Sequence, residues 1–155
     1  MQTDLFRRNK KLHISVLQLL WLLVSFLFFT TYFPWPSSLK RVILIAFGAE
    51  VGSGFVLRPN VFIKLPWKLK VGQNVWIGYG VFIDNEEFVR ISDSVCISQH
   101  TKIFTGSHDF NDETFAYIGA PVTINKGSWI AACAVIAPGA ELPANSFIKL
   151  SEKVK

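Results

Sequence analysis

The chain has 155 residues and a formal charge of +5; half of its residues are apolar and 17% are charged. This length predicts a single domain, and the composition excludes an intrinsically disordered chain. The two cysteines, Cys96 and Cys133, are too few for a disulfide framework and lack the paired spacing of a zinc ribbon. We therefore expect two free thiols in a reducing compartment.

Basic residues cluster at the N-terminus, where Arg7, Arg8, Lys10 and Lys11 directly precede a long apolar segment. No later stretch interleaves Lys or Arg with stacking aromatic residues, as proteins that bind single-stranded nucleic acid do. We therefore expect no nucleic-acid partner. The cluster is interpreted as a flank that faces solvent or anionic lipid.

Residues 13–39 contain no Asp, Glu, Lys or Arg, and residues 14–33 alone are long enough to cross a bilayer as a helix. No small-residue cleavage site follows the segment, which argues against a signal peptide. Three interpretations remain open. The segment spans a membrane, lies at a membrane interface, or caps one end of the following fold.

An aliphatic residue recurs every six positions from residue 51 onward. The members of this first series are Val51, Leu57, Ile63, Val71, Ile77, Ile83, Ile91, Ile97, Ile103, Ile124, Ile130, Ile136, Leu142 and Ile148. A second series, two positions earlier, is apolar or small throughout: Ala49, Phe55, Val61, Leu69, Val75, Val81, Val89, Val95, Thr101, Val122, Ser128, Ala134, Ala140 and Ser146. A strict period of six matches neither a helix nor the alternation of an antiparallel sandwich. It predicts a parallel β-helix.

The coils of this β-helix begin at Val51, Val71 and Ile91, which are twenty residues apart. Twenty residues make three hexads plus two extra residues, so we expect triangular coils with an insertion at one corner. The ends of such a solenoid expose unpaired strand edges that need a cover. The uncharged N-terminal segment is a natural cap for the first coil.

The repeat is interrupted at residues 104–121, which read FTGSHDFNDETFAYIGAP. Insertions at solenoid corners often carry function. His108 lies in this insertion, although a lone histidine is by itself more typical of a surface loop. The other histidines, His13 and His100, have no evident chemical context in the sequence.

The hexads, the TGSHDF of residues 105–110 and the KGSWIAACAVIAPG of residues 126–139 resemble the hexapeptide-repeat O-acetyltransferases. Within this family the chain is most similar to the colanic acid acetyltransferase branch, which is related to the maltose and galactoside O-acetyltransferases. The resemblance covers residues 10–148. It implies an all-β fold, a left-handed parallel β-helix with an N-terminal hydrophobic α-helical segment, that associates as a homotrimer.

The resemblance also implies a domain organisation. We expect a basic N-terminus and hydrophobic helix in residues 1–40 and the β-helix acyltransferase domain in residues 41–155. The active-site loop is then the insertion at residues 104–121.

By resemblance, His108 is the general base that takes a proton from the acceptor hydroxyl. Imidazole suits this role because its pKa of about 6.5 lies near neutral pH, and such catalysis contributes about 10²–10⁴-fold. The amide of Ala132 matches the donor that stabilises the oxyanion of the tetrahedral intermediate. No metal is expected, because the three-histidine zinc set of the related carbonic anhydrases is absent from the sequence.

The remaining site residues are likewise implied by the resemblance. The coenzyme A groove comprises Trp129, Ala131, Ala132, Lys149 and Leu150, and the residues that match the acceptor-binding region are Asn85 and Glu86. The family usually has two small residues where this chain has Lys149 and Leu150, and it continues into a further coil beyond the position of Lys155. The alternative is therefore a truncated, non-catalytic β-helix that serves as a scaffold or interaction module.

We predict an O-acetyltransferase that transfers acetyl from acetyl-CoA, its co-substrate, to a sugar hydroxyl in exopolysaccharide or cell-surface glycan biosynthesis. The acceptor is a sugar or a nucleotide- or lipid-linked glycan. Acetyl-CoA is kept inside the cell, so we expect a cytoplasmic protein in which residues 14–34 do not span the membrane. Peripheral contact with the inner membrane face through residues 5–34 fits a lipid-linked acceptor.

Overall fold

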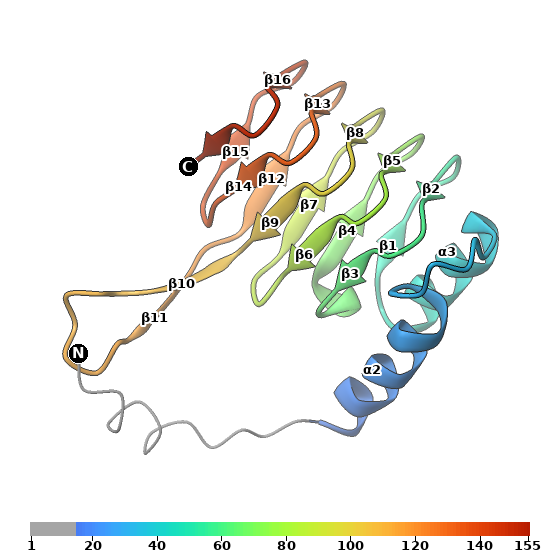
Figure 1. The fold of residues 1–155 in the computed structure, drawn as a ribbon, viewed down its shortest axis with the longest axis horizontal. Coiled ribbons are helices and arrows are strands. Elements are labelled where there is room, and N and C mark those ends of the chain that lie inside the picture. The colour runs from blue at the N-terminus through green and yellow to red at the C-terminus, as the bar shows by residue number, and fades with distance from the viewer. Residues whose placement is uncertain (1–14) are drawn as a thin grey trace.

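The computed structural model describes residues 15–155, which form a solenoid of short parallel strands with two helices at its N-terminal end (Figure 1). The helices are α2 (Val16–Phe28) and α3 (Ser37–Ala46), and a short 3-10 helix, η1, covers Pro66–Lys68. The solenoid strands are β1 (Glu50–Val51), β2 (Val56–Leu57), β3 (Phe62–Ile63), β4 (Leu69–Val71), β5 (Trp76–Ile77), β6 (Phe82–Asp84), β7 (Val89–Ile91), β8 (Cys96–Ile97), β9 (Lys102–Phe104), β12 (Val122–Ile124), β13 (Trp129–Ile130), β14 (Val135–Ile136), β15 (Glu141–Leu142), β16 (Phe147–Ile148) and β17 (Lys153–Val154).

These strands form three parallel five-stranded sheets, one for each side of the triangular coil. Sheet A has the order β1-β4-β7-β12-β15, sheet B β2-β5-β8-β13-β16 and sheet C β3-β6-β9-β14-β17. In the first coils the paired residues are twenty positions apart, as in Val51 with Val71 and Ile77 with Ile97. The parallel β-helix predicted from the hexads is therefore confirmed.

The solenoid core consists of the two predicted inward series. All members of the first series are buried, none more than 7% exposed. The second series is buried too except for Ser146, which lies at the last coil and is half-buried. Its hydroxyl donates to the carbonyl of Pro143, 2.6 Å away. Small and β-branched residues therefore fill the narrow corners, and Phe55 and Leu69 are the bulky exceptions the core accommodates.

Two of the three corners turn through a residue in the left-handed backbone region in each complete coil. Between sheets A and B these residues are Gly54, Asn74, Ser94, Gly127 and Asn145; between sheets B and C they are Asn60, Gly80, His100, Cys133 and Ser151. At Gly80 a Cβ would lie 2.5 Å from Nδ1 of His100 in the next coil, so this position requires glycine. The corner between sheets C and A instead carries the insertions, including η1 and residues 104–121.

The N-terminal segment forms two helices, where the sequence predicted one. Ser15 caps α2 in a capping box with Gln18, and α2 ends at Phe28. Pro34 and Pro36 cannot continue a helix, and α3 starts directly after Pro36. The second helix runs across the boundary expected between residues 40 and 41. Among the residues that the structure describes, neither helix has the length and apolarity to cross a membrane.

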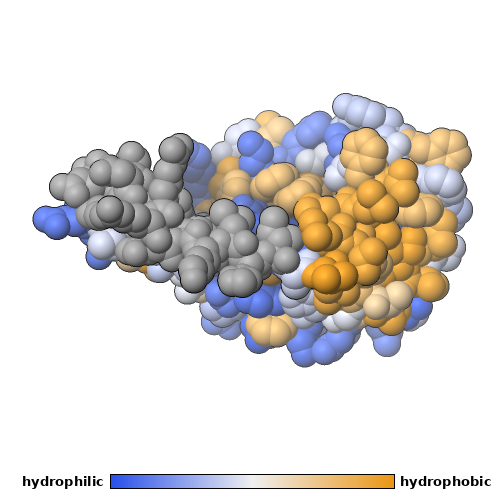
Figure 2. Space-filling model, turned by 90° about the horizontal axis from the view of Figure 1, so that it is seen from below, coloured by the Kyte–Doolittle hydropathy of each residue, from blue (hydrophilic) through white to orange (hydrophobic). Residues whose placement is uncertain are grey.

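Side chains of both helices donate hydrogen bonds to backbone carbonyls at the open edge of the first coil, with at least one such bond on each side of the triangle. The indole Nε1 of Trp21 donates to the carbonyl of Ile63 at 2.8 Å, Lys40 Nζ to that of Leu57 at 3.3 Å, and Arg41 Nη2 to that of Val51 at 2.8 Å. These carbonyls belong to β3, β2 and β1, which have no preceding strand. The segment therefore caps the solenoid. Its outward side is strongly apolar (Figure 2).

Candidate active site

The interruption of the repeat is an antiparallel hairpin that projects from the solenoid (Figure 1). Its strands are β10 (Gly106–His108) and β11 (Tyr117–Gly119), and His108 lies opposite Tyr117 in the register. The hairpin leaves the coil after β9 and returns before β12, at the corner between sheets C and A. At its base, the Thr105 amide donates to the carbonyl of Asp84 in the preceding coil and the Ala120 amide donates to the carbonyl of Thr105.

The ring of His108 is held in one orientation by the hairpin. Its Nδ1 lies 2.8 Å from the carbonyl oxygen of Phe115, and the two rings stack with centroids 4.4 Å apart and planes 3° from parallel. Tyr117 lies edge-on to the imidazole, with centroids 5.9 Å apart. A carbonyl oxygen only accepts hydrogen bonds, so Nδ1 carries the proton and the neutral ring has its lone pair on Nε2. This tautomer is the one a general base needs.

His108 lines a cavity of about 190 Å³ between the hairpin and the corner of the solenoid. The other lining residues are Lys64, Asp84, Glu86, Gly106, Ser107 and Tyr117. Lys64 Nζ lies 2.8 Å from the Asp84 carboxylate and 2.7 Å from that of Glu86. Burial alone would lower the pKa of Lys64, but hydrogen bonds and charge from both carboxylates outweigh it and raise that pKa. The cavity therefore presents a cation between two carboxylates.

Tyr117 adds a phenol to this cavity. Its pKa is raised by burial and by the charges of Glu87 and Glu86, so the phenol stays protonated and can donate a hydrogen bond. Sequence analysis missed Lys64, Asp84 and Tyr117 as cavity residues. Lys64 and Asp84 were detectable, because they are twenty residues apart and directly follow the paired inward residues Ile63 and Ile83 of successive coils. Tyr117 reaches the cavity only through the register of the hairpin.

Of the two residues expected at the acceptor, the structure brings only Glu86 to the cavity. Asn85 is fully buried, its amide Nδ2 donates to the carbonyl of Leu65 at 2.7 Å, and its Oδ1 accepts from the Leu65 amide at 3.0 Å. These two bonds tie consecutive coils together. A buried amide with both ends bonded to backbone has a structural role, which distinguishes Asn85 from Glu86.

The residues expected to bind coenzyme A lie together on sheet B and the corner that follows it. Trp129 is half-exposed, its Nε1 donates to Ser98 Oγ at 3.0 Å, and its ring lies 5.0 Å from that of Phe147. The pairing of Ile130 with Ile148 places Ala131 beside Lys149 in the next coil. Ala131 itself is buried and its amide donates to Ile148.

The amide of Ala132 differs from its neighbours. Ala131 and Cys133 donate to carbonyls of Ile148 and Gln99, whereas within the described part of the chain the N–H of Ala132 donates to no protein acceptor. The carbonyl of Ala132 accepts from Ser151, which follows the exposed Leu150. A backbone N–H without a protein acceptor at a turn is available to stabilise a negative charge.

The two groups of predicted site residues occupy different parts of the chain. His108 and Glu86 lie at the corner between sheets C and A, whereas Trp129 and Ala132 belong to sheet B and to the corner between sheets B and C. The lining of the His108 cavity includes neither Trp129 nor Ala132.

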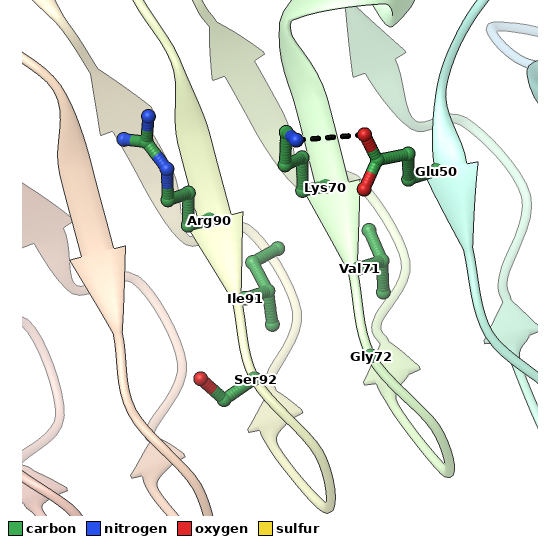
Figure 3. A pocket seen from close by; sticks show the side chains of 7 residues that line it. All are labelled: Glu50, Lys70, Val71, Gly72, Arg90, Ile91 and Ser92. Carbon is green, nitrogen blue, oxygen red and sulfur yellow. Dashed lines mark hydrogen bonds and ion pairs between the residues drawn. The ribbon is translucent and has the colours of Figure 1, made fainter.

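A second, open cavity of about 260 Å³ lies on sheet A (Figure 3). Lys70 in it is paired with Glu50 at 2.7 Å, and the guanidinium of Arg90 lies 5.0 Å from the Phe88 ring. It contains neither a histidine nor a thiol. Within the described residues, no group of three or more His, Cys, Asp or Glu side chains is placed to hold a metal ion.

Comparisons with known proteins identify relatives of the repeat region. The chain is 36% identical over 113 residues to the colanic acid biosynthesis acetyltransferase WcaF of Escherichia coli (strain K12), a match of 70% of this chain and 62% of the relative. It is 32% identical over 92 residues to nodulation protein L of Rhizobium leguminosarum bv. viciae, which covers 57% of this chain and 48% of the relative. The chain thus spans about three fifths of one curated relative and half of the other. No protein-family model matches it.

Two solved structures share the fold. A hexapeptide-repeat-containing acetyltransferase from Vibrio cholerae superposes with a TM-score of 0.81 over 98% of this chain and 89% of its own, at 16% identity. A galactoside acetyltransferase in complex with coenzyme A superposes with a TM-score of 0.79 over 97% of this chain and 79% of its own, at 21% identity. The predicted left-handed β-helix is confirmed by this agreement.

The sequence matches and the shared fold support the resemblance inferred from the hexads and the TGSHDF segment. Over its repeat region, the chain is a homologue of the colanic acid biosynthesis acetyltransferase WcaF and of nodulation protein L, with the fold of the hexapeptide-repeat acetyltransferases.

Proposed function

We propose that the protein is an acetyl-CoA-dependent O-acetyltransferase that acts on a sugar hydroxyl in the biosynthesis of an exopolysaccharide or cell-surface glycan. The observation that carries this proposal is the 2.8 Å contact of His108 Nδ1 with the Phe115 carbonyl oxygen in a polar cavity, from which the tautomer follows. The relationship to WcaF, a colanic acid biosynthesis acetyltransferase by name, supports the class of acceptor.

In the proposed reaction, Nε2 of His108 takes the proton of the acceptor hydroxyl while the hydroxyl oxygen attacks the carbonyl carbon of the thioester. The N–H of Ala132 stabilises the resulting oxyanion. The C–S bond then breaks, and the imidazolium returns its proton to the departing thiolate. The products are an acetyl ester of the sugar and free coenzyme A, so no covalent enzyme intermediate and no metal is required.

Acetyl-CoA would lie along sheet B, beside the indole of Trp129 and the turns that contain Ala131, Ala132, Lys149 and Leu150. The sugar would occupy the cavity of His108. Carboxylates that accept hydrogen bonds from hydroxyl groups, such as those of Glu86 and Asp84, suit a sugar, and Lys64 orients both of them. We assign the acceptor contact to Glu86 and not to Asn85.

A homotrimer would complete the site. Sheet B presents a mostly apolar outward row and sheet A a charged one; the sheet B row is Val56, Trp76, Cys96, Trp129 and Phe147, and the sheet A row is Glu50, Lys70, Arg90, Thr123 and Glu141. Sheet C adds a stacked pair, Phe62 and Phe82, with centroids 4.6 Å apart. A threefold assembly would cover these apolar residues and bring His108 of one chain to Trp129 of another.

Acetyl-CoA is a cytoplasmic metabolite, so we place the protein in the cytoplasm, with residues 5–34 in peripheral contact with the inner membrane face. The acceptor is then a sugar or a nucleotide- or lipid-linked glycan. The second candidate function is a non-catalytic scaffold. The scaffold function is favoured by Lys149 and the exposed Leu150. The family usually has two small residues at these positions, which let the chain that carries the thioester approach the backbone.

Two measurements on the purified chain separate these functions. Calorimetric titration with coenzyme A tests the groove, and release of free thiol from acetyl-CoA in the presence of mono- and oligosaccharides tests the reaction. We expect binding, and thiol release that depends on the sugar. Binding without turnover on any sugar would contradict catalysis, and the absence of both would favour the scaffold.

A further inference from the structure

The outward side of α2 is strongly apolar. Ser25 and Trp21 are the residues of α2 that are buried against the solenoid. The side facing away carries only large apolar side chains, namely Leu19, Leu20, Leu22, Leu23, Phe26 and Leu27, each more than half exposed. A helix that only capped the coil would face water with polar residues. On α2 the side facing away from the solenoid is instead apolar, like the side packed against it, where Val24 and Phe28 join Trp21.

The exposed surface continues past the end of the helix. Tyr32 and Phe33, in the turn after α2, are 74% and 57% exposed. Figure 2 shows the apolar patch at this end of the molecule, and we call this patch, formed by the outward side of α2 and this turn, the α2 surface. A contiguous apolar surface of this kind on a folded domain marks a site of interaction with another protein or with a membrane.

The charge of the surrounding sequence is uniformly positive. No Asp or Glu occurs between Asp4 and Glu50, while Arg7, Arg8, Lys10 and Lys11 precede the helix. These four lie outside the described residues, and in the sequence the last of them is five positions before Val16. The residues of the α2 surface therefore follow a basic cluster in a stretch of sequence that has no acidic counterpart.

We propose that the α2 surface inserts into the interface of a bilayer that contains anionic phospholipid. The exposed leucines and Phe26 would enter the boundary between headgroups and acyl chains, and the basic segment would bind the lipid phosphates. Pairing of two copies through the same surface fits less well, because a second copy brings no opposite charge for the basic cluster, whereas anionic lipid does. The proposal rests on the peripheral membrane contact proposed above, to which it adds the surface and the class of lipid, and its test does not depend on acetyl transfer.

Flotation of the full chain with vesicles tests the proposal. We expect binding to vesicles of phosphatidylcholine that contain phosphatidylglycerol and much weaker binding to phosphatidylcholine alone. Binding should weaken at high salt, because the Debye length falls to about 3 Å at 1 M. Replacing Arg7, Arg8, Lys10 and Lys11 by Gln should lower the partition coefficient about fivefold for each charge removed. Equal binding to both kinds of vesicle, or none to either, would overturn the proposal.

A second variant addresses the apolar contact. Leu23→Glu with Phe26→Glu changes two exposed side chains and should abolish flotation without altering the thermal midpoint. The matched control, Gln73→Glu with Ala144→Glu, introduces the same charge at exposed turns of the solenoid and should float like the unaltered chain. Light scattering without lipid identifies the rival occupant. If the α2 variant lowered the particle mass and the control did not, the surface would pair copies of the chain, contradicting the proposal.

Discussion

His108 and Phe115 are linked twice within one hairpin, by the hydrogen bond from Nδ1 to the Phe115 carbonyl at 2.8 Å and by the parallel stack of their rings. Phe115 has a left-handed backbone, with φ of 53°, which turns its carbonyl back toward the imidazole. The orientation and the tautomer of the histidine therefore come from residues within the hairpin, and the solenoid supplies the opposite wall of the cavity.

The first prediction concerns His108 itself. His108→Ala removes the proposed base and should lower turnover by about 10²–10⁴-fold, while coenzyme A binding and the thermal midpoint stay unchanged. The matched control is His100→Asn, since Asn tolerates the left-handed backbone that His100 adopts at its corner. The control should keep turnover within a few-fold. A His108 variant that turned over like the control would remove the histidine from the mechanism.

The second prediction concerns the acceptor. Glu86→Gln removes the negative charge that Lys64 orients and should raise the KM for the sugar, with the KM for acetyl-CoA unchanged. Glu87→Gln is the control, because Glu87 pairs with Lys68 at 3.5 Å and does not line the cavity. Initial rates measured at varied sugar and at varied acetyl-CoA separate the two constants. An equal effect of both substitutions would contradict the acceptor role of Glu86.

Much of the fold could be predicted because each coil repeats the same inward residues, so a local pattern reports the global architecture. The second helix was missed because it is short and contains Lys40 and Arg41 among its apolar residues. The sequence does not show that these two side chains donate to backbone carbonyls of the first coil. Asn85 and Glu86 were both expected at the acceptor because they match the family's acceptor-binding region, but the two side chains have opposite surroundings: Asn85 is buried and Glu86 lines the cavity.

The third prediction concerns the cap. Trp21→Phe keeps an aromatic ring but leaves the buried carbonyl of Ile63 without its donor, which should cost about 1–3 kcal/mol of unfolding free energy. Trp35→Phe removes an equivalent indole bond, to Leu27 at 3.1 Å, at an exposed site and should cost less than about 1 kcal/mol because water replaces the donor. Urea unfolding measures both. Equal losses of unfolding free energy in the two variants would contradict the prediction, because burial of the Ile63 carbonyl would then add no cost when its donor is removed.

The fourth prediction concerns pH. Burial, and to a smaller extent the charge of Arg58, lowers the pKa of Lys40 below its ordinary value of 10.5. Between the lowered pKa and 10.5 the unfolded chain therefore binds more protons than the folded chain, so this residue makes unfolding free energy rise with pH in that window. Below the lowered pKa its contribution is constant. The difference in unfolding free energy between the unaltered chain and Lys40→Met should grow with pH in the window; a constant difference would contradict a lowered pKa.

The last prediction concerns the assembly of the site from two chains. His108→Ala and Trp129→Ala should each be nearly inactive alone. If each site takes its histidine from one chain and its tryptophan from the next, random mixed trimers formed by co-expression contain sites with both residues intact. Such a site needs a chain with His108 followed by a chain with Trp129, which occurs at about one site in four for an equal mixture of the variants. Thiol release should therefore recover to about a quarter of the unaltered rate.

Mixing the variants after separate purification, without exchange of chains, is the control and should give no recovery. Co-expressed variants that stayed as inactive as either alone would mean that His108 and Trp129 do not act together across chains.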